Sequence, residues 1–111
     1  MEIIKQYGDF TKQEIFNLSQ GGGQLLKNAE DGTILEIDRI IVIKDDSQPD
    51  KDPKEIMHLQ TVEGTFYTTE SPTVQTTINL AINFMETHKL KFQLYRSQSK
   101  AGRTYMNVRL V

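Results

Sequence analysis

Two runs of alternating apolar and polar residues near the C-terminus predict a β-hairpin. Successive side chains of a strand point to opposite faces, so every second residue faces the same side. One face of these runs is apolar and consists of Leu90, Phe92, Leu94, Met106, Val108 and Leu110. The opposite face carries polar, basic and aromatic side chains: Lys91, Gln93, Tyr95, Tyr105, Asn107 and Arg109. The basic, glycine-containing stretch from Ser97 to Arg103 is the predicted turn between the two strands.

Residues 33–44 are rich in branched apolar side chains and predict one long strand. The parity of the apolar positions changes along this strand, so a bulge or sharp bend at residues 38–40 is needed to turn both sets inward. The two sets are Leu35 with Ile37 and Ile40 with Val42. A long first strand with a bend in its middle is typical of a small barrel.

Two shorter strands and a helix follow in the sequence. Residues 55–62 and 65–69 have strand composition, and Gly64 between them favours a tight hairpin. Ser71 and Pro72 predict a helix start, because serine caps free amides and proline at the first helical position loses no hydrogen bond. We expect the helix to run to about His88 and to bury an apolar stripe of Val74, Ile78, Ala81, Ile82 and Met85.

The first 29 residues give a weaker pattern. Thr11 followed three residues later by Glu14 has the spacing of a capping box and predicts a short helix that ends near Ser19. The three glycines at 21–23 lack the Lys-Ser/Thr pair of a phosphate-binding loop. We therefore interpret them as a flexible or closely packed link into the body of the protein.

Residues 44–54 are the clearest predicted loop, since they are charged, contain two prolines and lack large apolar groups. Their four aspartates do not have the glycine and terminal glutamate of a calcium loop, so we expect neither a metal nor a cofactor. His58 has no carboxylate or second histidine at a useful spacing. It is therefore interpreted as a packing or surface histidine rather than a ligand or a base.

The composition is that of one soluble domain of 111 residues. The absence of cysteine excludes disulfides and thiolate chemistry. The sequence shows neither an apolar run long enough for a membrane span nor a signal peptide, so we expect a cytoplasmic protein. Charge is unevenly distributed: residues 89–111 hold six basic and no acidic side chains, whereas residues 30–70 hold eleven acidic and four basic ones. A local basic patch can bind phosphate despite the net charge of −2.

The order of these elements predicts a mainly β protein with an OB-fold-like barrel. We expect five strands, one helix between the third and fourth strands, and a short N-terminal helical segment. In this interpretation residues 1–29 pack on or extend from the barrel, and residues 30–111 form the OB-fold domain. The alternative is an α+β sandwich in which the helix covers an open sheet.

Two segments resemble the single-stranded DNA-binding proteins of phages and mobile elements of Gram-positive bacteria. The first is Gly64-Thr-Phe-Tyr-Thr-Thr-Glu-Ser-Pro before the helix, and the second is Tyr95-Arg-Ser-Gln-Ser-Lys-Ala-Gly-Arg-Thr-Tyr105 between the last two strands. The resemblance covers about residues 55–111. Bacterial housekeeping single-strand binders end in an acidic tail that recruits partners, whereas this sequence ends in the strand-like residues 107–111, so recruitment through a tail is not implied.

The resemblance implies binding of single-stranded DNA without sequence preference, in replication or recombination, and no enzymatic activity. Bases stack on aromatic rings while phosphates bind Lys and Arg. The expected site residues are Tyr67, Lys91, Tyr95, Arg96, Lys100, Arg103, Tyr105 and Arg109. Of the neighbouring rings Phe66 and Tyr67, which have opposite parity, we expect Phe66 to face the core. A homo-oligomer and replication or recombination proteins are open as further partners, and no membrane contact is expected.

Two other functions are alternatives to this one. A small protein-interaction domain of a mobile element would use the acidic region between Glu30 and Glu70 to bind a basic partner, and it would not bind oligonucleotides. An enzyme has little support, because the acidic residues do not pair with a histidine or a metal-ligand set at any recognisable spacing. The tyrosines are also compatible with half-buried rings at a barrel edge, and Lys100 and Arg103 with a soluble turn.

Overall fold

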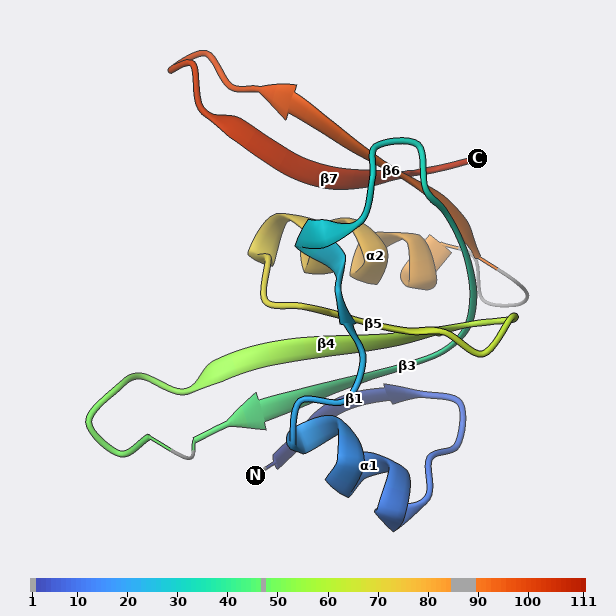
Figure 1. Cartoon of the computed structure of the whole chain (residues 1–111), viewed down its shortest axis with the longest axis vertical. Coiled ribbons are helices and arrows are strands. Elements are labelled where there is room, and N and C mark those ends of the chain that lie inside the picture. The colour runs from blue at the N-terminus through green and yellow to red at the C-terminus, as the bar shows by residue number, and fades with distance from the viewer. Residues whose placement is uncertain (1, 47, 85–89) are drawn as a thin grey trace.

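The computed structural model describes residues 2–46, 48–84 and 90–111, and these form one curled, seven-stranded sheet with two α-helices (Figure 1). The elements in chain order are β1 (Glu2–Tyr7), α1 (Lys12–Ser19), β2 (Gln24–Leu25), the 3-10 helix η1 (Leu26–Asn28), β3 (Ile34–Asp45), β4 (Lys54–Thr61), β5 (Phe66–Thr69), α2 (Pro72–Phe84), β6 (Lys91–Gln98) and β7 (Thr104–Leu110). The strands follow the order β2-β5-β4-β3-β6-β7, and β1 also pairs with β3.

The long strand β3 gives the sheet its curl. Its N-terminal part pairs with β6, its C-terminal part pairs with β1, and β4 runs along its other edge. The pairing register between β3 and β4 shifts between Ile37 and Arg39, which confirms the predicted bulge. The bend lets both apolar sets of β3 face the core, as their change of parity requires.

The protein is mainly β and resembles a half-barrel, but two predicted details were wrong. Within the described residues the sheet has seven strands rather than five, and α2 lies between the fifth and sixth strands rather than the third and fourth. The difference comes from the N-terminal segment, because β1 adds to β3 and the two-residue β2 adds to β5 in parallel. β1 is almost wholly exposed and has no buried alternation, so the sequence pattern did not reveal it.

The main core lies between the concave face of the sheet and α2. Ser71 Oγ accepts a hydrogen bond from the Val74 backbone N–H at 3.2 Å, which confirms the predicted helix start. The predicted end at His88, and Met85 of the apolar stripe, lie outside the described residues. The fully buried side chains of this core include Leu26, Leu35, Met57, Leu59, Val74, Ile78, Phe92 and Leu94. Burial of each such side chain contributes about 1.5–3 kcal/mol.

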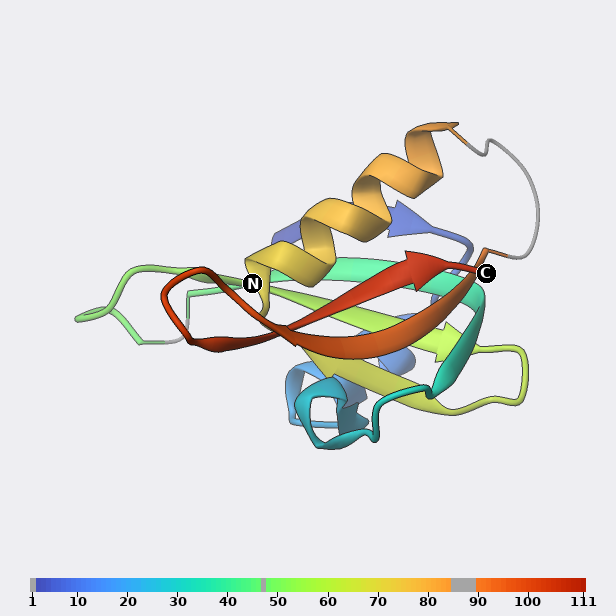
Figure 2. The ribbon, with the colours of Figure 1, turned by 90° about the horizontal axis from the view of Figure 1, so that it is seen from above.

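Figure 2 shows α1 and α2 on opposite faces of the sheet. A second, smaller core lies between α1 and its face of the sheet. It consists of Leu18, Ile41 and Ile43, with Phe10, Ile15 and Phe66 packed against it. The capping box of Thr11 and Glu14 is present, as predicted. Because helices cover both faces of β3 here, residues 40–43 are buried without a break.

Arg39 ties α1 to the sheet. Its guanidinium donates to the Glu14 carboxylate, to the backbone carbonyl of Asp9 and to the side-chain carbonyl of Gln60, and it lies 4.4 Å from the centre of the Phe10 ring. Hydrogen bonds from Arg39, and then from the Thr11 backbone, lower the pKa of Glu14 from 4.5 to about 2. Arg39 is therefore occupied within the fold.

The triple glycine is a closely packed link, one of the two forms expected. A Cβ on Gly22 would lie 2.8 Å from the backbone oxygen of Asn17, which is closer than side chains approach. Gly23 has φ of 110°, and a Cβ there would meet Thr68 and Phe66 of β5. The glycines therefore let the chain leave α1 and pass tightly over β5 into β2.

Candidate nucleic-acid interface

The outer face of the β6–β7 hairpin gathers four side chains, Gln93, Tyr95, Tyr105 and Arg109, which we call the hairpin face. The strand register places Gln93 opposite Arg109 and Ser97 opposite Tyr105, so these residues share one side. On the other side Phe92, Leu94 and Val108 are buried in the main core. The predicted division of the hairpin into an apolar and a polar aromatic face is therefore present in the structure.

Arg109 and Tyr95 form the centre of the hairpin face. The guanidinium carbon of Arg109 lies 4.8 Å from the centre of the Tyr95 ring, and its Nε donates to Gln93 Oε1 at 3.2 Å. These two contacts hold the planar guanidinium over the ring. Tyr95 is half-buried and Arg109 is exposed, so the arrangement offers solvent a flat, positively charged surface.

Tyr105 lies nearer the hairpin turn, with 38% of its surface exposed. Asn107, between Tyr105 and Arg109 in β7, does not extend this face, because its Oδ1 accepts hydrogen bonds from Thr77 Oγ1 of α2 and from the Val108 amide. The two tyrosines and Arg109 are thus the ring and cation components that the fold brings together here.

Lys100 and Arg103 lie in the turn at the end of the hairpin, and both are exposed. The turn is closed by a hydrogen bond from the Ser99 amide to the Arg103 carbonyl at 2.8 Å. Gly102 has φ of 80°, a conformation that glycine adopts without strain. The two cations therefore extend from a defined turn next to Tyr105.

Lys91 lies at the other end of β6 and is exposed. Its backbone is paired with Glu36 of β3, so a carboxylate lies on the neighbouring strand. The positive charge of this end of the hairpin is therefore lower than that of the turn.

Arg96 lies on the opposite face of β6 from Tyr95. Its guanidinium donates to the carbonyls of Lys27 and Ala29, at 2.7 and 2.8 Å, and forms an ion pair with Asp31. These contacts fasten the segment around η1 to the hairpin. In the structure Arg96 thus contacts protein groups and is separated from the hairpin face.

Phe66 and Tyr67 point to opposite faces of β5, as their parity requires, but the expected assignment was wrong. Tyr67 packs against the main core, whereas Phe66 packs against the smaller core beneath α1. Parity alone could not decide which ring faces the barrel, because α1 supplies a second apolar surface. The part of Tyr67 that stays accessible lines a small cavity with Gln24, Asn28 and Thr33.

Two neighbours of Arg109 were not among the expected site residues. Gln93 orients the guanidinium, and Ile34 of β3, which is 46% exposed, is paired with Gln93 and extends the same row. The alternation of β6 already places Gln93 on this face. The position of Ile34 depends on the pairing of β3 with β6, which the local sequence does not contain.

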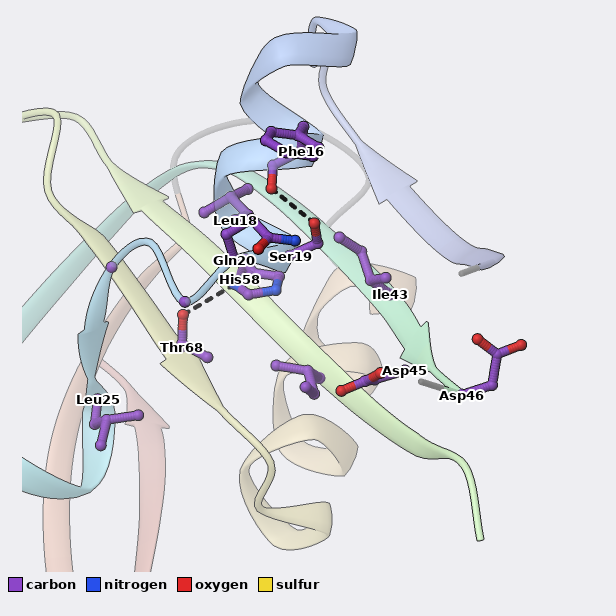
Figure 3. Close-up of a pocket in the computed structure, with 13 residues that line it drawn as sticks. Phe16, Leu18, Ser19, Gln20, Leu25, Ile43, Asp45, Asp46, His58 and Thr68 are labelled. Carbon is purple, nitrogen blue, oxygen red and sulfur yellow. Dashed lines mark hydrogen bonds between the residues drawn. The ribbon is translucent and has the colours of Figure 1, made fainter. Parts of the chain in front are cut away.

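A separate cavity of about 840 Å³ opens beside the C-terminal end of α1 (Figure 3). His58 lies in its floor with 3% of its surface exposed, and its Nδ1 is 2.9 Å from Thr68 Oγ1. Burial lowers the pKa of His58 from 6.5 to about 4, so its ring is neutral at physiological pH. His58 is thus almost completely buried, and its ring borders this cavity.

The described residues contain no group of three or more His, Asp or Glu side chains arranged to hold a metal ion. Their helices are likewise too short or too polar to cross a membrane.

Comparison with known proteins identifies the family. Residues 8–111 match the family described as phage single-stranded DNA-binding protein. The chain is 32% identical to the single-stranded DNA-binding protein of Bacillus phage phi29 over 102 residues, which are 87% of this chain and 82% of that protein. The chain belongs to this family. The corresponding protein of Bacillus phage PZA gives the same identity and coverage, and no solved structure matches significantly.

Membership in the phage single-stranded DNA-binding protein family confirms the resemblance found in residues 55–111. The match extends further, because it begins at residue 8 and so includes α1 and β2. The family match therefore covers both the hairpin and the elements that line the cavity beside α1.

Proposed function

We propose that the protein binds single-stranded DNA without sequence preference, in the replication or recombination of phage DNA. The observation that carries this proposal is the Arg109–Tyr95 stack on the hairpin face, with exposed Tyr105 and the turn cations beside it. Membership in a family of phage single-stranded DNA-binding proteins supports it independently.

The hairpin face suits an unpaired strand because its two kinds of group match the two parts of a nucleotide. Bases stack on Tyr105 and on the outer surface of the Arg109 guanidinium, and phosphates bind Lys100, Arg103 and the charge of Arg109. Neither contact reads the hydrogen-bonding edge of a base, so the interaction tolerates any sequence. In duplex DNA the base faces are already stacked on each other, and only the phosphate contacts are available.

The remaining expected residues have smaller parts in this proposal. Lys91 adds charge at the far end of β6, where Glu36 of the adjacent strand offsets it. Arg96 supports the site from behind, through its hydrogen bonds to the segment around η1. Tyr67 is accessible only through the cavity that it lines with Gln24 and Asn28, away from the hairpin face.

A fluorescence titration tests the proposal. Labelled oligo-dT and a duplex of the same length are each titrated with the protein at two salt concentrations. We expect tighter binding to the single strand, with an affinity that falls as salt rises because bound phosphates release counterions. Equal affinity for both, or no binding to either, contradicts the proposal. Sedimentation of the same mixtures reports whether several copies of the protein associate on the DNA.

A further inference from the structure

The cavity beside α1 has a neighbouring cavity on the open side of the half-barrel. A second cavity, of about 360 Å³, shares the side chains Leu25, Ile56 and Thr68 with the first. It continues to Lys27 and to Met106 of β7. We call these two neighbouring cavities the seam groove. Together they extend from the C-terminal end of α1 to Met106 of β7.

The seam groove exists because the barrel does not close. In the described chain β5 pairs with β4 and β2, and β7 pairs with β6, so no strand pairing joins β5 to β7. β2 covers β5 only at Tyr67 and Thr68. Thr69 at the end of β5 is therefore not paired with β2, and Thr68 lines both cavities.

The walls of the groove at the α1 end are apolar and include an exposed ring. Phe16 of α1 is 60% exposed and Leu25 of β2 is 46% exposed. Figure 3 shows them on either side of His58 in the cavity. Removing Phe16 and Leu25 from water would be favourable.

The floor of this end offers one directed polar atom. His58 is 97% buried, since only 3% of its surface is exposed, and Nδ1 is used by Thr68. Nε2 makes no hydrogen bond to any of the described residues. The ring is neutral at physiological pH, so Nε2 can form a hydrogen bond with a neutral partner in the cavity.

Charged side chains line both ends of the groove. Asp45 and Asp46 line the α1 end, and Lys27 and Glu70 line the end near β7. Charge does not distinguish the two ends, so the position of a base in the groove is set by the apolar wall and the polar floor at the α1 end.

We propose that the α1 end of the seam groove holds one unpaired nucleobase of the bound strand, stacked on Phe16 and hydrogen-bonded to His58 Nε2. This inference rests on the proposed function, since it adds a base site to the hairpin face. A nucleobase has apolar faces and a polar edge, and the groove supplies apolar walls and a polar floor in the same arrangement. A peptide segment would match the apolar walls but leaves the single directed contact of His58 unexplained.

Photo-crosslinking and matched variants test the site. The probe is an oligo-dT that carries 5-iododeoxyuridine, which crosslinks to nearby aromatic side chains on irradiation. We expect a crosslink to Phe16 in the wild-type protein and its loss in Phe16→Ala. Phe16→Ala should also weaken oligo-dT binding roughly tenfold, the usual scale for one base stacked on a ring. Leu80→Ala is the control, because Leu80 is 54% exposed and belongs to α2 on the opposite face.

A second variant examines the polar contact. His58→Phe keeps a ring but removes Nε2, and circular dichroism with thermal unfolding verifies that the protein is folded. We expect severalfold weaker binding to oligo-dT and no change in binding to an abasic oligonucleotide, which has phosphates but no bases. If His58→Phe does not fold, Phe16→Ala, at an exposed position, still tests the base site with the same two oligonucleotides.

The outcomes separate this inference from the proposed function. If the wild-type protein binds oligo-dT but neither variant changes the affinity, and crosslinks occur only at Tyr95 or Tyr105, the base site is wrong while single-strand binding stands. If the wild-type protein does not bind single strands, the proposed function itself is wrong. Lost crosslinking and lowered affinity in Phe16→Ala, with Leu80→Ala unchanged, support the site.

Discussion

The guanidinium carbon of Arg109 lies 4.8 Å from the centre of the Tyr95 ring. The two residues are not direct cross-strand partners, since Arg109 lies opposite Gln93 and Tyr95 lies opposite Asn107. The contact is therefore diagonal, and the hydrogen bond from Arg109 Nε to Gln93 holds the guanidinium in that direction. A flat cation is thus presented before any DNA is bound, which lowers the conformational entropy lost on binding.

This relationship predicts that Arg109 contributes to DNA binding through both its charge and its planar shape. Arg109→Ala should weaken oligo-dT binding about tenfold. It should also make the slope of log K against log salt concentration shallower by about 0.7, the value expected when one phosphate contact to a single strand is lost. Arg109→Lys should keep the salt dependence but recover only part of the affinity, because lysine has no planar surface. Titrations at several salt concentrations measure both quantities. Lys5→Ala, which removes an exposed cation from β1, is the control and should leave the affinity nearly unchanged.

Tyr105 is predicted to bind a base without stabilising the fold. Its ring is 38% exposed, so Tyr105→Ala should change the free energy of unfolding by about 0.5 kcal/mol or less. Loss of one base stack should cost about 1–3 kcal/mol of binding. Chemical denaturation and fluorescence titration measure the two effects. Unchanged affinity in both Tyr105→Ala and Arg103→Ala would remove the turn end of the hairpin from the interface.

Arg96 is predicted to act mainly on stability. Arg96→Ala leaves the carbonyls of Lys27 and Ala29 without their donor and should lower the free energy of unfolding by about 1–3 kcal/mol. Arg103→Ala, in the exposed turn, is the matched control and should change it by about 0.5 kcal/mol or less. Urea denaturation provides the measurement. A large loss of DNA affinity in Arg96→Ala with wild-type stability would instead indicate a direct phosphate contact.

His58 predicts a loss of stability in mildly acidic solution. Its pKa is lowered by burial from 6.5 to about 4, so between these pH values the unfolded chain binds a proton that the folded protein does not. The free energy of unfolding should therefore decrease as the pH falls from about 6.5 to about 4. The carboxylates that line the same cavity as His58 are those of Asp45 and Asp46. Thermal unfolding at several pH values measures the decrease.

His58→Gln isolates this effect, because the variant lacks the titrating ring and should show a smaller decrease between pH 6.5 and 4.5. Glu14 acts at lower pH. Its pKa is lowered to about 2, so its contribution is present above about 4.5 and is lost as the pH falls toward 2 in both proteins. Identical pH profiles above 4.5 would contradict the assignment to His58.

The local sequence was sufficient to predict those features of the fold that depend on one periodicity or one helix cap. The alternation of β6 and β7 set the two faces of the hairpin, and the parity change in β3 located the bulge between Ile37 and Arg39. The capping residues Thr11 and Ser71 located both helix starts. Each of these signals depends on residues within a few positions of one another.

The tertiary structure decided everything that depends on which segments meet. It packed Tyr67 rather than Phe66 against the main core because α1 covers the other face of β5. It turned Arg96 toward the segment around η1, and it limited the pairing of β2 with β5 to Tyr67 and Thr68. The sequence by itself determined two strands with a basic, aromatic face and a capped helix before them. Only the fold determined which of those side chains stay accessible, because accessibility depends on contacts between residues far apart in the chain.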